Sequence, residues 1–404
     1  MTKDARELIP MRVGIDASNI RTGGGVTHLV EILRAVNPAE HDISRIIVWG
    51  GLKTLAQLPD EPWLELAHQP LLDGSLLHRT YWQKMRLTGL AQKQSDVLFV
   101  PGTNYSGEFQ PFLTMMQNLL PFDTVERYRY GLSWMHLRLL LLHYSQIKSF
   151  KKSNGIIFLS DYARKALLNQ VKFKKEEEAV IPHGINEDFR FTPRPQLSLS
   201  NYSFSKPFRF LYVSIVDIYK HQWHVVEAIA KLRQEKVPIA LDLIGPAYPP
   251  VLHRLLHVIE KLDPDKEFIH YHGAIPYSDL ARQYYLADGF IFASTCETFG
   301  QILTEAMAAG LPIACSNRSA MPEILGDAGV YFNPESVPEI TDAIRTLVEN
   351  PELRANYADK AFEKAKSYSW TRCAYETFAF IRKVAQSASN SRSKFRNIMI
   401  GKEH

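Results

Sequence analysis

The feature that most constrains the fold of this 404-residue chain is an alternation of short apolar runs with helical stretches, which occurs twice. In the first half, runs typical of buried strands lie at 12–16, 46–49, 97–100, 113–116, 155–159 and 179–181. In the second half, strands are expected at 209–213, 240–244, 268–271, 289–293 and 312–314, and helices at 223–234, 251–261, 277–286, 301–309 and 338–348. Such alternation predicts parallel sheets with helices on both faces.

A stretch rich in Pro, Ser and Asn separates the two series, and Pro193, Pro195 and Pro207 block regular structure there. The length also favours two domains, because single cores stop growing at roughly 250 to 300 residues. We therefore predict an N-terminal Rossmann-like domain at 1–188, a linker at 189–207, a C-terminal Rossmann-like domain at 208–370, and a closing helix and tail at 371–404. Two such domains facing each other place a cleft at the carboxyl ends of both sheets.

The overall composition is that of an ordinary globular protein, with 46% hydrophobic and 22% charged residues. The formal charge of +4 is too small to indicate a nucleic-acid partner. The three cysteines, Cys296, Cys315 and Cys373, have no metal-type spacing. The first ten residues carry charges before any apolar run, and no stretch is long and apolar enough to span a bilayer. These features predict a cytoplasmic protein.

The segment from Ser294 to Cys315, STCETFGQILTEAMAAGLPIAC, carries the clearest chemical signal. It follows an expected strand and opens an expected helix, so the backbone N–H groups of Phe299, Gly300 and Gln301 can bind phosphate or sugar oxygens at the helix start. Glu297 lies before that helix and Glu305 lies inside it. The segment therefore predicts an anion site flanked by two carboxylates.

Two glutamates separated by seven residues, with Phe-Gly after the first and Ala-Met-Ala-x-Gly-x-Pro after the second, resemble the donor motif of family-four retaining glycosyltransferases. The resemblance implies the GT-B fold, with a C-terminal helix crossing back onto the N-terminal, acceptor-binding domain. It also implies that Glu305 binds the ribose of the nucleotide and that Glu297 binds the transferred sugar. Phe299, Gly300, Gln301 and, from the loop at 23–25, Gly24 and Gly25 would contribute to donor binding.

Lys220 resembles the family's phosphate lysine, and a positive charge there would stabilise the departing diphosphate. Two departures from the family pattern stand out. The family's arginine before that lysine is replaced by Ser214 or Ile215, and its His-Asp pair is replaced by Gln117 and Asn118. Gln117 or Asn118 could still bind a sugar hydroxyl.

Three other features have competing interpretations. Asp263 and Asp265 form a DPD triplet that resembles a metal motif, but its position after an amphipathic stretch favours a helix end and turn, so we expect no metal and no cofactor. His183 is expected to be a structural loop residue. The stretch 127–152 has six basic residues and no acidic one, which predicts either an anionic-membrane surface helix or a core helix with one solvated face.

Together these features predict a metal-independent, retaining glycosyltransferase that uses a GDP-mannose-type or UDP-sugar donor. By resemblance, it would transfer a hexose or deoxyhexose to a growing glycan or lipid-linked acceptor of lipopolysaccharide, O-antigen or capsule synthesis, at the inner face of the cytoplasmic membrane. The alternatives are another GT-B enzyme, such as a nucleotide-sugar epimerase, and a non-catalytic protein that binds sugar nucleotides.

Overall fold

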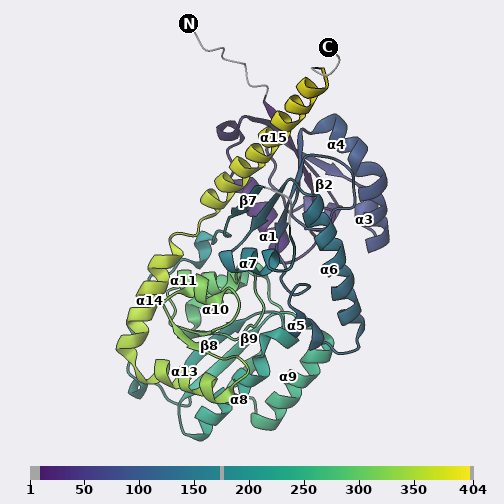
Figure 1. The fold of residues 1–404 in the computed structure, drawn as a ribbon. Coiled ribbons are helices and arrows are strands. Elements are labelled where there is room, and N and C mark those ends of the chain that lie inside the picture. Colours follow the sequence, from purple (N-terminus) through teal and green to yellow (C-terminus); the bar gives the residue numbers. More distant parts are fainter. Residues whose placement is uncertain (1–9, 173–176, 401–404) are drawn as a thin grey trace.

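The computed structural model describes residues 10–172 and 177–400, the last ten of them by backbone alone, and it contains one parallel sheet in each half of the chain (Figure 1). The expectation about the N-terminal charges therefore falls on residues outside the described part. Among the described helices, none combines the length and apolar character needed to cross a membrane.

The N-terminal sheet has seven strands in the order β3-β2-β1-β4-β5-β6-β7. Their bounds are Met11–Asp16 (β1), Ile43–Gly50 (β2), Leu64–His68 (β3), Val97–Val100 (β4), Phe112–Met116 (β5), Gly155–Phe158 (β6) and Glu177–Val180 (β7). The central strands β1, β4 and β5 are almost entirely buried because helices cover both faces of the sheet, as their apolar runs predict.

Seven helices accompany this sheet: Gly24–Ala35 (α1), Leu52–Leu55 (α2), Leu76–Trp82 (α3), Thr88–Gln94 (α4), Thr124–Tyr128 (α5), Trp134–Lys152 (α6) and Asp161–Leu168 (α7). The basic stretch at 127–152 is thus divided between the end of α5 and the whole of α6. Helix α1 begins within the glycine loop and buries Val26, Leu29 and Leu33 in the core.

The C-terminal sheet has six strands in the order β10-β9-β8-β11-β12-β13. Its strands are Phe208–Val213 (β8), Ile239–Ile244 (β9), Ile269–Tyr271 (β10), Gly289–Phe292 (β11), Ile313–Ser316 (β12) and Val330–Phe332 (β13). Its helices are Gln222–Gln234 (α8), Pro249–Leu262 (α9), Tyr277–Leu286 (α10), Gln301–Ala308 (α11), Met321–Leu325 (α12), Val337–Glu349 (α13) and Pro351–Ala365 (α14). The strand order reverses at β1 and at β8, and the crevices at such switch points are where open α/β sheets bind ligands.

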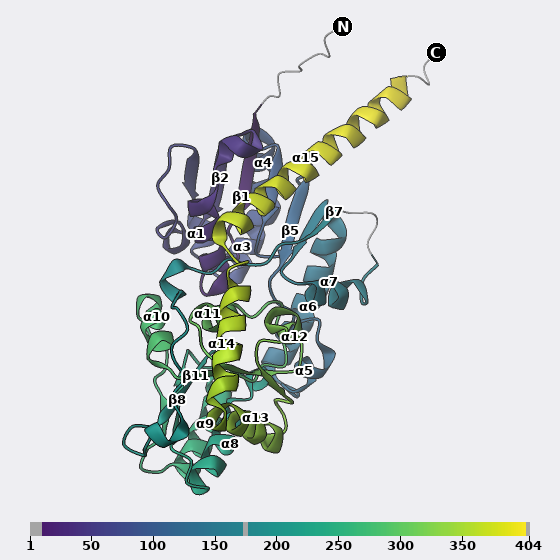
Figure 2. The ribbon, with the colours of Figure 1, turned by 90° about the vertical axis from the view of Figure 1, so that its left-hand side faces the viewer.

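The last helix, α15 (Trp370–Ile400), returns from the C-terminal half and runs along the N-terminal half, where it packs on α1 (Figure 2). Ion pairs from Arg382 to Asp42 and from Lys383 to Glu177 fasten it there. Gly184 lies directly against its first turn, since a Cβ on Gly184 would lie 2.2 Å from the backbone nitrogen of Trp370. The crossing helix implied by the resemblance is therefore present, and it occupies most of the expected closing segment.

Arg354 of α14 fixes the proline-rich segment between the two sheets. Its side chain is fully buried and donates to the backbone oxygens of Leu347 and Val348 at 2.6 and 2.7 Å. It also donates to Gln196 Oε1 at 3.0 Å and to the backbone oxygen of Leu197. A buried guanidinium requires such partners, so this one residue ties the segment to the end of α13.

Candidate active site

A cavity of about 400 Å³ lies between the two halves of the chain, at the carboxyl ends of β8 and β9. Gly23, Gly24 and Thr27 line it from the N-terminal half, and His183 and Trp370 line it from the segments that connect the halves. The C-terminal half supplies the remaining wall, which consists of Val213, Ser214, Ile215, Lys220, Ile244, Gly245, Pro246, Ala274, Ile275, Tyr277, Leu280, Gln301, Ile302 and Glu305. A mostly apolar wall with a few converging polar groups is typical of a small-molecule site.

Glu305 lines this cavity from the second turn of α11, as the sequence predicts. Its side chain is 2% exposed, and the hydroxyl of Tyr284 donates a 3.0 Å hydrogen bond to Oε2. Burial raises the pKa of Glu305 to about 8, because the charged form loses its hydration, and the Tyr284 hydrogen bond only partly opposes this. Glu305 is therefore mainly a protonated acid at neutral pH.

Lys220 and Glu297 form an ion pair that joins two loops 77 residues apart in the sequence. Lys220 ends a 3-10 turn after β8, and its ammonium lies 5.1 Å from the centroid of the Phe292 ring and 4.9 Å from that of Tyr219. Lys220 lines the cavity. Glu297 is its counter-ion and is not among the residues that line the cavity. A nearly buried ammonium is stable only with such a partner.

Ser319 holds Glu297 in place through the backbone. Its hydroxyl accepts from the N–H of Glu297 and donates to the carbonyl oxygen of Glu297, both at 2.7 Å. Ser319 itself has a φ of 61°. Ser319 therefore holds the backbone of Glu297, and Lys220 pairs with its side chain.

Gly300 starts helix α11 with a φ of 88°, a conformation that favours glycine. A Cβ at this position would also lie 2.7 Å from Cε of Met321. Gln301 follows it, lines the cavity and donates from Nε2 to the backbone oxygen of Gly184 at 2.8 Å. Phe299 points away into the core, where its ring packs edge-on against His183.

The glycine loop at 23–25 meets the cavity through Gly23 and Gly24, while Gly25 packs below Gln117. Gln117 directs its amide nitrogen to the sulfur of Met115 at 3.2 Å, and its backbone oxygen accepts from Thr298 across the cleft. The side-chain oxygen of Asn118 accepts from the N–H of Leu120. Gln117 therefore lies beside Gly25 and Thr298, but neither Gln117 nor Asn118 is among the residues that line the cavity.

The sequence did not identify three of the residues that line the cavity as site residues: His183, Ser214 and Trp370. His183 was expected to be structural, but it lines the cavity, and its Nδ1 lies 3.0 Å from Nδ1 of His28. The hydroxyl of Ser214 is buried and has no protein partner in the described part of the chain, which leaves it available to a ligand. Trp370 packs on both histidines.

Hydrogen bonds also connect the two halves outside the cavity. Glu323 of α12 accepts from the backbone N–H groups of Asp161 and Tyr162 at 2.8 and 2.7 Å, and so caps the first turn of α7 from the other half. Tyr130 donates to Asp217 at 2.8 Å, close to the turn that carries Lys220. Polar contacts therefore join the two halves of the chain in this structure.

Other candidate ligand-binding features have structural explanations. The carboxylate of Asp263 accepts from the N–H groups of Glu267, Phe268 and Ile269 at 2.7 to 2.9 Å, as expected for a helix end and turn. Potential metal-ligand atoms of His28, His183 and Cys373 lie within 4.8 Å of one another, but burial raises the pKa of Cys373 to about 12, which disfavours the thiolate.

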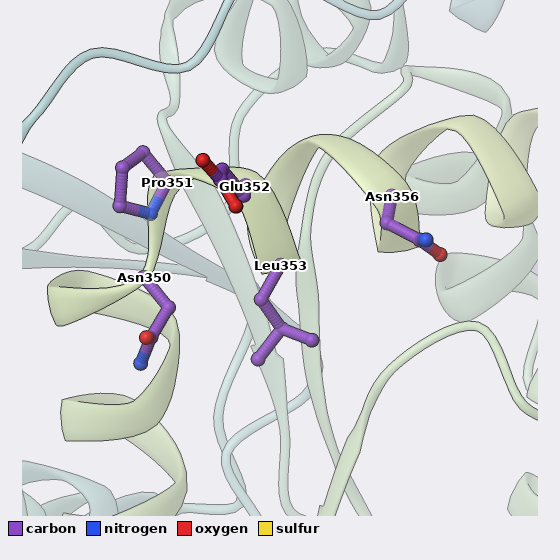
Figure 3. A pocket seen from close by; sticks show the side chains of 5 residues that line it. All are labelled: Asn350, Pro351, Glu352, Leu353 and Asn356. Atoms are coloured by element: carbon purple, nitrogen blue, oxygen red, sulfur yellow. The ribbon is translucent and has the colours of Figure 1, made fainter.

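A second hollow lies where α13 meets α14, and Figure 3 shows the side chains of Asn350, Pro351, Glu352, Leu353 and Asn356 around it. Residues from a single short segment line this hollow, unlike the cavity between the halves. None of its lining residues belongs to the motifs in the sequence.

Comparison with known proteins agrees with this geometry. Residues 195–364 match the family model described as glycosyl transferases group 1. The O-antigen chain mannosyltransferase B of Escherichia coli is 25% identical over 234 residues, which cover 57% of this chain and 61% of that enzyme. For this and two further curated relatives, the matched part is between 20% and 61% of their own length.

Two solved structures share the fold over almost the whole chain. The Anabaena protein HepE in complex with UDP-glucose has a TM-score of 0.65 at 18% identity, covering 94% of this chain and all of that one. WaaG, a glycosyltransferase involved in lipopolysaccharide biosynthesis, has a TM-score of 0.65 at 16% identity, covering 91% and 99%. The chain thus has the GT-B fold, and residues 195–364 in its C-terminal half are similar to glycosyl transferases group 1.

Proposed function

We propose that the whole protein is a retaining hexosyltransferase that takes its sugar from a nucleoside diphosphate donor of the GDP-mannose or UDP-sugar type. The observation that carries the proposal is the convergence of Glu305, Lys220 and the start of α11 on one cavity between the two sheets. The similarity to a mannosyltransferase of O-antigen synthesis supports a hexose donor. The HepE complex with UDP-glucose supports a nucleotide sugar as the class of ligand.

In this proposal the apolar wall of β8, β9 and α10 receives the nucleoside, and Glu305 accepts hydrogen bonds from the ribose hydroxyls. Lys220 and the N-terminus of α11 stabilise the diphosphate as negative charge develops on it. The bond from the anomeric carbon to the phosphate oxygen breaks, and a bond to the acceptor oxygen forms on the same face of the sugar. The proton of the acceptor hydroxyl passes to the departing phosphate oxygen, so the step needs no nucleophile from the protein.

The same proposal places the acceptor, a growing O-antigen, lipopolysaccharide or capsule glycan on a lipid carrier, on the side of the N-terminal half. An exposed apolar face there supports contact with the membrane. Four residues of α6 form a stripe along the helix, with exposed fractions of 47% to 72%: Trp134, Leu137, Leu141 and Tyr144. Leu76, Leu77, Tyr81 and Met85, on α3 and the turn after it, are also exposed.

The two helices that carry this face border the same loop, because Ser145 of α6 and Gln83 after α3 both donate to Asn104. Arg138, Lys148 and Lys151 are exposed on α6, and no acidic residue occurs in 127–152. Arg127 and Arg129 do not contribute, since Arg127 is buried against Pro121 and Arg129 pairs with Glu126 and Glu335. Apolar side chains flanked by basic ones suit an anionic bilayer at the cytoplasmic side.

Liposome co-sedimentation tests the membrane part of the proposal. The double variant Trp134→Ala, Leu141→Ala should bind anionic phosphatidylglycerol vesicles less than the wild type does, while Leu256→Ala, an exposed leucine on α9, should not differ. Equal binding by all three proteins would remove the lipid surface as the partner. A concentration-dependent dimer that Trp134→Ala abolishes would assign the face to a second copy instead.

Comparison of the two glutamates tests the catalytic part. The ribose does not change during the reaction, so Glu305→Gln should chiefly raise the donor KM, whereas the sugar gains positive charge, so Glu297→Gln should chiefly lower kcat. Calorimetry with the nucleoside diphosphate should show weakened binding for Glu305→Gln and retained binding for Glu297→Gln. The opposite pattern would reverse the two roles, and the absence of any sugar transfer by the wild type would favour an epimerase or a binding protein.

A further inference from the structure

Two histidines from distant parts of the sequence meet at the wall of the donor cavity. His28 comes from α1 and is fully buried, and His183 follows β7 and lines the cavity. Their Nδ1 atoms are 3.0 Å apart, a hydrogen-bond distance. One proton must therefore lie between these two nitrogens. His183 lines the cavity to which the donor is assigned, so any role of the two histidines in ligand binding rests on the proposed function.

The surroundings of the pair decide which histidine carries that proton. Burial lowers the pKa of His183 to about 4 and that of His28 well below its usual range, so both rings are neutral at pH 7. Nε2 of His28 is buried and has no hydrogen-bond partner among the described residues. Were this nitrogen protonated, it would be an orphaned buried N–H, which is rarer in proteins than an unsatisfied acceptor.

His28 is therefore the tautomer with its proton on Nδ1, and it donates to Nδ1 of His183. The single proton of the neutral His183 ring must then lie on Nε2. Within the described part of the chain, no hydrogen bond is formed by this Nε2. His183 thus presents a neutral N–H donor whose orientation and tautomer are set by a buried neighbour.

The position of His183 indicates what this donor meets. Its ring packs against Phe299, with centroids 5.7 Å apart, and the next residue, Gly184, accepts from Gln301 in the first turn of α11. His183 therefore lies at the N-terminus of α11, where anions bind. Lys220 is the one cation among the described residues that line the cavity, and its neighbours in the lining, Ser214 and Ile215, carry no charge.

We propose that His183 is a donor-binding residue whose Nε2–H donates to an oxygen of the donor's diphosphate, with His28 as the positioning residue that fixes its tautomer. A neutral N–H can supply a second contact to the diphosphate beside Lys220 without adding a second buried charge. Hydrogen bonds to charged acceptors are the stronger ones, so the contact distinguishes a nucleoside diphosphate from the bare nucleoside.

Calorimetry with GDP, UDP and the corresponding nucleosides tests this assignment. His183→Ala should weaken binding of whichever diphosphate the wild type prefers by about 10- to 100-fold, the range for a lost hydrogen bond to a charged group, and leave the nucleoside unchanged. His183→Asn, which keeps a neutral N–H donor, should recover part of the loss. His253→Ala, an exposed histidine on α9, is the matched control and should bind like the wild type.

Nitrogen-15 NMR of labelled histidines provides a readout that a merely structural role would not change. The His183 signals should show a protonated Nε2 that shifts when the diphosphate is added, and His28→Gln should mix the two tautomers. The assignment is overturned if His183→Ala binds the diphosphate normally, if it loses nucleoside and diphosphate equally, or if the proton is found on Nδ1 of His183. A wild-type protein that binds neither GDP nor UDP would instead refute the proposed function.

Discussion

Replacing Glu305 by Gln should make the protein less sensitive to alkaline pH. The native carboxyl group has a pKa of about 8, against 4.5 for an ordinary glutamate, so between these values the native state holds a proton that the unfolded chain has released. The free energy of unfolding therefore decreases as the pH rises from 4.5 to about 8. The glutamine side chain of the variant resembles the protonated acid in shape and has no proton to lose, so the variant lacks this decrease.

The size of the effect follows from the pKa difference. Each pKa unit corresponds to about 1.36 kcal/mol, so the full rise corresponds to about 5 kcal/mol, of which roughly 3 kcal/mol is expressed between pH 5.5 and 8.5. For a domain of this size, 1 kcal/mol shifts the melting temperature by roughly 2 to 4 °C. Between these two pH values, the wild-type transition should therefore fall by roughly 6 to 12 °C more than that of Glu305→Gln.

Differential scanning calorimetry without nucleotide is the appropriate assay, because other titrating groups change both proteins alike and cancel in the comparison. Tyr284→Phe is a useful second variant, since it removes the hydrogen bond that partly stabilises the ionised carboxylate. It should steepen the pH dependence. Parallel curves for the wild type and Glu305→Gln would show that Glu305 is ionised in the native state, and the account of its burial would be wrong.

Three further predictions concern the site and its frame. Lys220→Ala should lower kcat about 100-fold or more with an unchanged circular dichroism spectrum, the scale for a lost transition-state donor, and near-normal turnover would show that another group carries the diphosphate. Activity should persist in excess EDTA, and loss restored by Mg²⁺ or Mn²⁺ would contradict metal independence. Arg354→Ala should destabilise the protein by roughly 2 to 4 kcal/mol in urea unfolding, because several buried acceptors lose their partner, and a change below about 0.5 kcal/mol would exclude that role.

The sequence predicts the central strands well, but two edge strands, β3 and β13, were not expected. Strands such as β4 and β8 are continuous apolar runs because both of their faces are covered, and these runs are visible without a structure. Strand β3 lies at an edge, where Glu65 and His68 alternate with apolar residues, and β13 has three residues. Neither presents a run long or apolar enough to distinguish it from a loop.

In the candidate site, too, features set by neighbouring residues could be predicted, and contacts between distant residues could not. The conformation of Gly300 and the position of Glu305 in the helix follow from neighbouring residues, so the motif predicts them. The Lys220–Glu297 and His28–His183 pairs join positions 77 and 155 residues apart, and their formation depends on how loops from different strands approach. A single sequence considered alone contains no signal for contacts between such distant loops. For this reason His183 was expected to be structural.

The Lys220–Glu297 pair links the two parts of the donor motif through charge. The ammonium of Lys220 is nearly buried, and Glu297 supplies the opposite charge beside it. In the proposed reaction, the diphosphate would take over this neutralising role at Lys220, and the Glu297 carboxylate would then turn to the sugar. The Lys220–Glu297 ion pair thus fixes both side chains before donor binding, and in the proposed reaction the donor would release the Glu297 carboxylate. Lys220 and Glu297 therefore lie on two loops that meet at this ion pair, whereas Glu305 is held separately by Tyr284.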